Sequence, residues 1–249
     1  METPETTASP DSMGTRITNV FASPSEAFQR LDTDPSRSLH WVIPFLLILV
    51  LGVLSVYLIF STESLRDQIY DLQAQQFDKA VEEGRMTQQQ ADQIRDRMEQ
   101  TGLGLFMVFG AIPIVLFTCA YFFLGALFLW LASKIVFKTQ LKYGKYLEMY
   151  GLASWIGVLG SLVTLVMFLG LDSIFATPSL GLLYLDGFDP TNTMHKLAGA
   201  LNVFSVWQAV VIGMGLSALS RQPSGKGIAV ALVLWAVWLA IGVPLGLIR

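Results

Sequence analysis

The chain has little of what most enzyme sites are built from. It contains one cysteine, Cys119, and two histidines, His40 and His195, so it can form no intrachain disulfide and offers few soft metal ligands. It has no glycine-rich phosphate loop, nucleophile elbow or metalloprotease motif. The sequence therefore predicts no catalytic centre, no metal site and no cofactor.

Charge is also scarce. Charged residues make up 14% of the 249 residues, against 53% hydrophobic residues, and the net charge is only −3. Basic residues are not interleaved with aromatic ones, which argues against nucleic-acid binding. The few charges gather in the ends and connecting loops, and the long stretches between them are apolar.

Five apolar stretches dominate the chain, and each is nearly free of charge across its middle. They cover residues 41–60, 103–131, 149–171, 197–219 and 226–248. A helix needs about 20 apolar residues to cross the hydrocarbon layer, where lipid offers no partner to an open backbone group. We therefore predict an all-α, polytopic membrane bundle of five transmembrane helices, with the lipid bilayer as its first partner.

The distribution of Lys and Arg predicts the orientation. Residues 1–15 are polar and are expected to be disordered; they do not read as a signal peptide, so the first span is expected to act as an uncleaved anchor. Basic residues gather in the N-terminal arm, in residues 134–145 and in residues 221–226. Because basic loops stay on the cytoplasmic side, we expect a cytoplasmic N-terminus and an outside C-terminus.

Two polar segments carry helix signals. In the arm, residues 16–40, the run Ser23-Pro24-Ser25-Glu26 marks a helix start, and the short helix lies either on the membrane surface or against the bundle. Residues 61–100 predict an extramembrane helical hairpin whose second helix opens with a capping box of Thr87 and Gln90. A solvated spacer is the favoured interpretation of this hairpin, and a docking surface is the alternative.

Polar residues inside the fourth apolar stretch are the candidates for function. Asn202, Ser205 and Gln208 lie on neighbouring helix faces with Trp207 between them. They line a substrate path or bond to adjacent helices, and we favour helix contacts because no charged partner accompanies them. Glu148 is expected at an end of the third span, where its charge stays solvated.

Small residues four positions apart predict close helix packing. The pairs are Ala153 with Gly157, Gly157 with Ser161, Gly213 with Ser217, and Gly242 with Gly246. Such spacing puts both members on one helix face and lets two backbones approach. Contacts within the bundle explain these pairs most simply, and a homodimer face is the alternative. Residues 172–196 are expected to form a partly inserted or interfacial segment on the outer side.

Several short motifs are similar to a known family. The run Phe21-Ala22-Ser23-Pro24-Ser25-Glu26-Ala27-Phe28, then Trp41-Val42-Ile43-Pro44, resembles the opening of the Ypt/Rab-interacting-protein (YIP) family in its bacterial form. Residues 131–134, 143–150, 202–207 and 212–216 resemble its later segments. The resemblance implies a five-span protein of the cell (inner) membrane with a cytoplasmic N-terminus.

Eukaryotic members of that family bind Rab-type GTPases and coat proteins and shape or traffic membranes. Their Asp-Leu-Tyr-Gly-Pro motif is absent from this chain, so Rab binding is not carried over. The prediction is a non-enzymatic protein that organises or adapts other membrane components, with other membrane proteins or a second copy as partners. The alternative is a small transporter or channel subunit.

Overall fold

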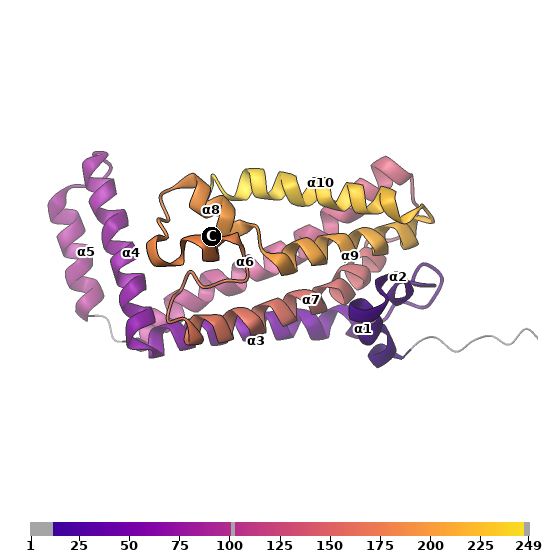
Figure 1. Ribbon diagram of the computed structural model, residues 1–249, viewed down its shortest axis with the longest axis horizontal. Helices are drawn as coiled ribbons and strands as arrows, with labels where there is room; N and C mark the ends of the chain where they lie inside the picture. Colours follow the sequence, from indigo (N-terminus) through magenta and orange to yellow (C-terminus); the bar gives the residue numbers. More distant parts are fainter. Residues whose placement is uncertain (1–11, 101–102, 247–249) are drawn as a thin grey trace, which may run out of the picture. The chain divides into compact units, whose positions relative to one another are not determined.

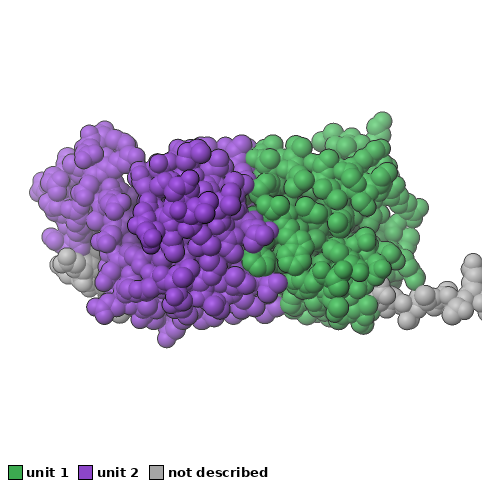
Figure 2. All heavy atoms as spheres, in the orientation of Figure 1, with its two compact units in different colours: residues 1–46, 122–157, 204–238 green, residues 47–121, 158–203, 239–249 purple. Residues whose placement is uncertain are grey.

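The computed structural model describes residues 12–100 and 103–246, and within these ranges it contains helices and loops with no strand (Figure 1). The chain divides into two compact units, which are coloured separately in Figure 2. Unit 1 comprises residues up to 46 together with 122–157 and 204–238, and unit 2 comprises 47–121, 158–203 and the residues from 239 onwards. Several long helices contribute to both units, and each unit is described by itself.

Five helices are long and apolar enough to cross a membrane. They are α3 (Leu39–Ser61), α6 (Leu103–Ala132), α7 (Tyr143–Gly170), α9 (Val203–Ser220) and α10 (Ser224–Gly242). At 1.5 Å per residue, even the 18 residues of α9 extend about 27 Å, close to the thickness of the hydrocarbon layer. The predicted all-α, five-span polytopic architecture is confirmed.

The outer surfaces of the spans are apolar. Large side chains such as Val50, Phe109, Leu116 and Val166 are each more than 60% exposed. A water-soluble protein rarely leaves such a surface open, whereas lipid covers it without cost. The structure therefore has the surface of a multi-pass membrane protein.

Three spans have boundaries that differ from the apolar stretches. Helix α7 begins at Tyr143, six residues before the expected start, because the polar side chains of its first turns are buried and not solvated. Helix α9 begins at Val203 and not at residue 197, because Asn202 pairs with Ser179 in an isolated bridge. Helix α10 ends at Gly242, and a turn follows in which Gly246 has a φ of 68°.

The N-terminal arm packs against the spans of unit 1. It consists of α1 (Met13–Ala22), capped by Ser12, and α2 (Pro24–Ala27). Helix α1 starts inside the stretch expected to be disordered; residues 1–11 of that stretch lie outside the described residues. Val20, Phe28 and Leu31 of the arm are fully buried, in one core with Met149 and Leu216 from α7 and α9. The arm therefore shares a hydrophobic core with the spans of unit 1.

Unit 2 carries the extramembrane hairpin. Helices α4 (Glu63–Glu82) and α5 (Gln88–Gln100) lie side by side, and α4 leaves α3 at a steep angle (Figure 1). The capping box forms at the start of α5, where the Thr87 N–H donates to Gln90 Oε1 and the Gln90 N–H donates to Thr87 Oγ1. Arg95 of α5 pairs with Asp78 of α4 at 2.6 Å.

The connection between α7 and α9 also belongs to unit 2. It contains the 3₁₀ helix η2 (Leu180–Gly187) and α8 (Thr193–Ala200), which Asn192 caps. Backbone bonds from Leu180 N–H to Leu201 O and from Val203 N–H to Pro178 O fold the segment back on itself. The expected interfacial segment is thus a compact subdomain of short helices.

Candidate functional site

Buried charges cluster in unit 1 where the arm meets α3 and α7. The arm contributes Arg16, which is only 2% exposed although it carries a charge and lies on the short helix α1. Its guanidinium donates to the carbonyl oxygens of Ala27 (2.9 Å) and Gln29 (3.4 Å), which the short helix α2 leaves without helical partners. It also pairs with the carboxylate of Asp34 at 2.7 Å. The Arg16 guanidinium thus bonds to three acceptors within residues 27–34 of the arm.

Asp34 connects the arm to α7. Its carboxylate accepts from Arg16, and its backbone oxygen accepts from the ammonium group of Lys145 at 2.5 Å. Lys145 lies on the first turn of α7 and also reaches Glu148, one turn later, at 3.4 Å. The chain of contacts from Arg16 to Glu148 therefore alternates positive and negative groups.

Glu148 is the centre of the cluster. It is 2% exposed, and its Oε1 lies 2.6 Å from Nδ1 of His40 and 3.2 Å from the backbone N–H of Arg37. His40 is on the first turn of α3, and Arg37 lies two residues before that helix begins. A carboxylate at a helix N-terminus is stabilised by the helix dipole as well as by these donors. Glu148 therefore joins the entrance of α3 to the start of α7.

The imidazole of His40 uses one nitrogen only. A carboxylate can only accept hydrogen bonds, so with Glu148 ionised the Nδ1 of His40 donates. The other nitrogen, Nε2, is buried and has no hydrogen-bond partner among the described atoms. Burying a nitrogen without a hydrogen-bond partner costs free energy. The hydrogen bond to Glu148 and the packing around the ring must outweigh this cost for His40 to stay buried.

This arrangement is suited to holding elements together. The described residues contain no group of three or more His, Cys, Asp or Glu side chains that could hold a metal ion. The four charges of Arg16, Asp34, Lys145 and Glu148 balance, and every one contacts an opposite charge. The cost of desolvation offsets most of the attraction within buried pairs of this kind, but removing one member leaves the other buried charge without a partner.

The sequence did not reveal this cluster. Glu148 was expected at the solvated edge of the third span, and that expectation is wrong, because the arm covers it. A local signal existed in the spacing of Lys145 and Glu148, which are three apart on a helix. The partners of Glu148 on the arm side are more than 100 residues away, and a single sequence does not connect them.

A second buried group consists of hydroxyls at the end of α6. Ser133, the first residue of the π-helix η1 (Ser133–Phe137), lies 2.6 Å from the hydroxyl of Tyr146, 2.9 Å from that of Thr139 and 3.0 Å from that of Ser220. A serine acts as a nucleophile when a base activates it, and these three neighbours are all hydroxyls. The group ties the end of α6 to α7 and α9.

The four polar residues predicted on the fourth span are divided between the two units. Asn202 precedes α9 and pairs with Ser179 in unit 2, while Ser205, Trp207 and Gln208 belong to unit 1. The amide of Gln208 donates to Ser154 Oγ on α7 at 3.4 Å. The ring of Trp207 meets that of Phe21 edge-on, with centroids 5.9 Å apart. In unit 1, Gln208 thus contacts α7 and Trp207 contacts the arm.

The predicted packing residues fall into three groups. A Cβ added to Gly157 would lie 3.1 Å from the amide oxygen of Gln208, which fits a helix contact, and Ser161 lies one turn further on α7, in unit 2. Gly242 ends α10, whereas Gly246 lies beyond it in the left-handed region, so these two do not share a helix face.

Gly213 and Ser217 lie where α9 meets α10. A Cβ on Gly213 would come within 2.4 Å of the Ile228 Cα atom. Ser217 Oγ accepts from the Gly227 N–H at 3.0 Å and faces the carbonyl oxygens of Pro223 and Ser224, both at 3.1 Å. The two helices therefore approach through backbone, which only residues without large side chains allow.

The fold and the cluster define a class: a multi-pass, all-helical membrane protein whose buried polar groups fix an N-terminal arm onto its spans. Within that class, the model of the Yip1 domain matches residues 18–245. The chain therefore belongs to the Yip1 family. The match begins inside α1 and includes the rest of the arm, the hairpin and all five spans.

The other two comparisons give no further relatives. No curated protein and no solved structure matches the chain.

Proposed function

We propose that this Yip1-family protein is a non-enzymatic organiser or adaptor of other membrane components. The observation that carries the proposal is the use of its buried polar groups. Glu148, His40, Lys145, Asp34 and Arg16 bond to one another and to the backbone where the arm meets the spans. A folded arm held in one position is suited to presenting a constant surface to a partner.

The competing function, a small transporter or channel subunit, needs polar groups that line a common path. In unit 1, the Gln208 amide bonds to Ser154 beside Gly157, and Asn202 belongs to unit 2, where its backbone forms a bridge with Ser179. The bond of Gln208 favours a helix contact over a substrate contact. This supports the adaptor and gives the transporter no specific observation of its own.

We further propose that the protein lies in the cell membrane with its N-terminus in the cytoplasm and its C-terminus outside. Basic loops support this orientation. Single cysteines in a Cys119→Ser background test it, with one at Gln29 on the arm and one at Gln89 on the hairpin, both exposed. An impermeant maleimide applied to intact cells is expected to label position 89 and not position 29. The opposite pattern would reverse the orientation.

Site-specific photo-crosslinking in native membranes tests the adaptor function. A crosslinking residue at Gln29 samples the arm, one at Gln89 samples the hairpin, and one at Val166 samples the lipid-facing surface of α7. We expect a reproducible, stoichiometric protein adduct from Gln29 or Gln89. Adducts with lipid alone at all three positions, together with saturable substrate flux in proteoliposomes, would overturn the proposal in favour of transport.

A further inference from the structure

The connection between α6 and α7 in unit 1 carries three lysines that the charge cluster does not use. Lys134 lies in η1, and Lys138 and Lys142 follow it before α7 begins. All three residues are exposed, and we call them the lysine edge. The sequence has no acidic residue between Glu99 and Glu148, so the whole connection is basic.

The charges of the lysine edge are not neutralised as other charges of unit 1 are. Exposed Arg221, for example, pairs with Asp32 of the arm at 2.8 Å. Among the described residues, no carboxylate forms an ion pair with Lys134, Lys138 or Lys142. The ammonium group of Lys134 lies 4.2 Å from the centroid of the Trp130 ring, an attraction that leaves its charge in place. The lysine edge therefore presents three positive charges.

The lipid-facing side of α6 continues into the lysine edge. Exposed apolar side chains recur at helical spacing through the end of α6 and into η1, at Leu124, Phe128, Leu131 and Ile135. The last of them, Ile135, is 76% exposed, and lipid is the surrounding that covers such a side chain without cost. Lipid thus reaches the segment between Lys134 and Lys138, whose long side chains extend from apolar surroundings to the head groups.

Hydrogen bonds and ring contacts fix the connection that carries the lysine edge. Trp130 Nε1 donates to the backbone oxygen of Leu141 at 3.1 Å, and the Trp130 ring meets that of Tyr143 edge-on, with centroids 6.2 Å apart. The hydroxyls of Ser133 and Thr139 lie 2.9 Å apart. Trp and Tyr side chains are typical of the boundary between lipid and water. The lysine edge is therefore an ordered surface at that boundary.

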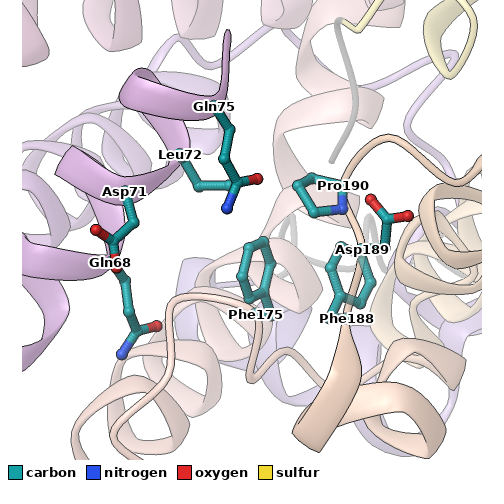
Figure 3. A pocket seen from close by; sticks show the side chains of 8 residues that line it. All are labelled: Gln68, Asp71, Leu72, Gln75, Phe175, Phe188, Asp189 and Pro190. Atoms are coloured by element: carbon teal, nitrogen blue, oxygen red, sulfur yellow. The ribbon is translucent and has the colours of Figure 1, made fainter. Parts of the chain in front are cut away.

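The extramembrane part of unit 2 has the opposite character. A hollow of about 370 Å³ lies between α4 and residues 175–190 (Figure 3). Asp71 and Asp189 lie on opposite sides of this hollow, and none of its eight lining side chains is basic. Such a surface repels anions. Unit 2 therefore provides a place for control substitutions that remove lysines without touching the lysine edge.

The surroundings of the lysine edge select an anion that also has apolar chains. Basic residues next to a transmembrane helix attract the phosphate groups of anionic lipids. A zwitterionic lipid carries its own ammonium group, which offsets the charge of its phosphate. A free phosphate ion would meet the same lysines but would leave Ile135 and Val136 uncovered.

We propose that the lysine edge binds the phosphate head group of an anionic phospholipid whose acyl chains cover Ile135 and Val136. This site does not depend on the adaptor function proposed above. It requires only that the spans lie in a membrane and that η1 lies at the boundary between lipid and water.

Native mass spectrometry of the full-length protein in a maltoside detergent tests the site. We expect the protein to retain phosphatidylglycerol in preference to phosphatidylcholine with the same chains, and the double variant Lys134→Gln/Lys138→Gln to reduce this preference about fivefold. Lys79→Gln/Lys196→Gln is the matched control, because it removes the same charge from α4 and α8 of unit 2. Equal reductions in the two double variants would overturn the site.

A charge-preserving variant separates binding from folding. Lys134→Arg/Lys138→Arg keeps both positive charges and is expected to keep the preference for phosphatidylglycerol. A loss as large as that of Lys134→Gln/Lys138→Gln would assign the effect to altered packing of η1 and would overturn the role of charge.

Competition with inorganic phosphate tests the lipid as the source of the anion. The protein is incubated with phosphatidylglycerol and an equal concentration of inorganic phosphate, then separated by gel filtration, and the retained lipid is quantified. We expect phosphate to leave the retained lipid unchanged, because it makes no contact with the apolar side chains. Displacement of the lipid would identify a site for free phosphate and would overturn the proposal.

Discussion

The two units contain ion pairs of nearly the same geometry in very different surroundings. In unit 1, Arg16 and Asp34 approach to 2.7 Å, and their side chains are 2% and 11% exposed. In unit 2, Arg95 and Asp78 approach to 2.6 Å, but their side chains are 33% and 59% exposed. The distance between two charges does not therefore indicate what the pair does; the surrounding solvent decides.

The difference follows from what each pair connects. The unit 1 pair belongs to a network that also contacts backbone carbonyls and α7, so removing one member leaves other buried groups unsatisfied. The unit 2 pair joins two surface helices, and water replaces either partner when it is lost. We expect the arm to respond to substitutions as a core does, and the hairpin to respond as a surface does.

The largest effect is expected from Glu148→Ala. The substitution removes the partner of His40, Lys145 and the Arg37 N–H at once, and it leaves the ammonium group of Lys145 without a carboxylate. Loss of one member of a buried charge pair typically costs about 3–5 kcal/mol. Unfolding in mixed micelles of increasing denaturing detergent measures this change. Glu148→Gln, which keeps an acceptor without the charge, is expected to lose less, and a loss below about 1 kcal/mol for Glu148→Ala would contradict the network.

Gly227→Ala is expected to have the next largest effect, because it separates α9 from α10. A Cβ at this position would lie 2.2 Å from Ser217 Oγ and 2.3 Å from the backbone oxygen of Gly213. Overpacking of this kind costs about 1–3 kcal/mol. Gly225→Ala is the matched control, two residues away on the same helix, where an added Cβ meets nothing within 4 Å. The control is expected to be neutral or stabilising, and equal losses for both variants would contradict the backbone contact.

The five spans followed from the sequence because crossing a bilayer demands long apolar helices, whatever the detailed packing. The capping box at Thr87 and Gln90 followed for a similar reason, since both residues act locally. Helix α1 was missed although Ile17, Val20 and Phe21 recur at helical spacing, because the segment is short and polar overall; the burial of Arg16 and Val20 stabilises it. Glu148 was missed because hydropathy treats every charge as solvated, and its true partners lie on the distant arm.

The start of the fourth span is a second feature that hydropathy did not place correctly. Residues 197–202 are apolar enough to extend α9, yet the structure assigns them to α8 and to a bridge with Ser179. The competing hydrogen bonds come from residues 178–180, which fold back from the end of α7. Hydropathy measures how apolar a segment is and does not detect such a return.

Asp78→Ala tests the solvated ion pair of the hairpin in the same way. The pair of Asp78 with Arg95 is solvated, so its loss is expected to cost at most about 1 kcal/mol. The same detergent unfolding measurement applies, and high salt is expected to reduce the already small effect. A loss as large as that of Glu148→Ala would mean that the hairpin is a buried element of the protein and not a solvated one.

The smallest expected effect concerns a single exposed carboxylate of unit 2. The Thr191 hydroxyl, and then its backbone N–H, lower the pKa of Asp189 by donating to the carboxylate at 2.7 Å each. A lowered pKa in the folded state means that these bonds stabilise the fold above the ordinary pKa of an aspartate and cease to do so as the pH falls through the lowered value.

Thr191→Val removes the hydroxyl and keeps the N–H, so the pKa of Asp189 is expected to rise toward its ordinary value, as followed by NMR titration of the carboxyl carbon. Thr191→Ser retains the hydroxyl and is expected to leave the pKa low; a rise in both variants would assign the shift to the shape of the turn and not to the hydrogen bond. The comparison between the units thus extends to exposed groups, where a local hydrogen bond changes the protonation of one side chain while the fold around it stays intact.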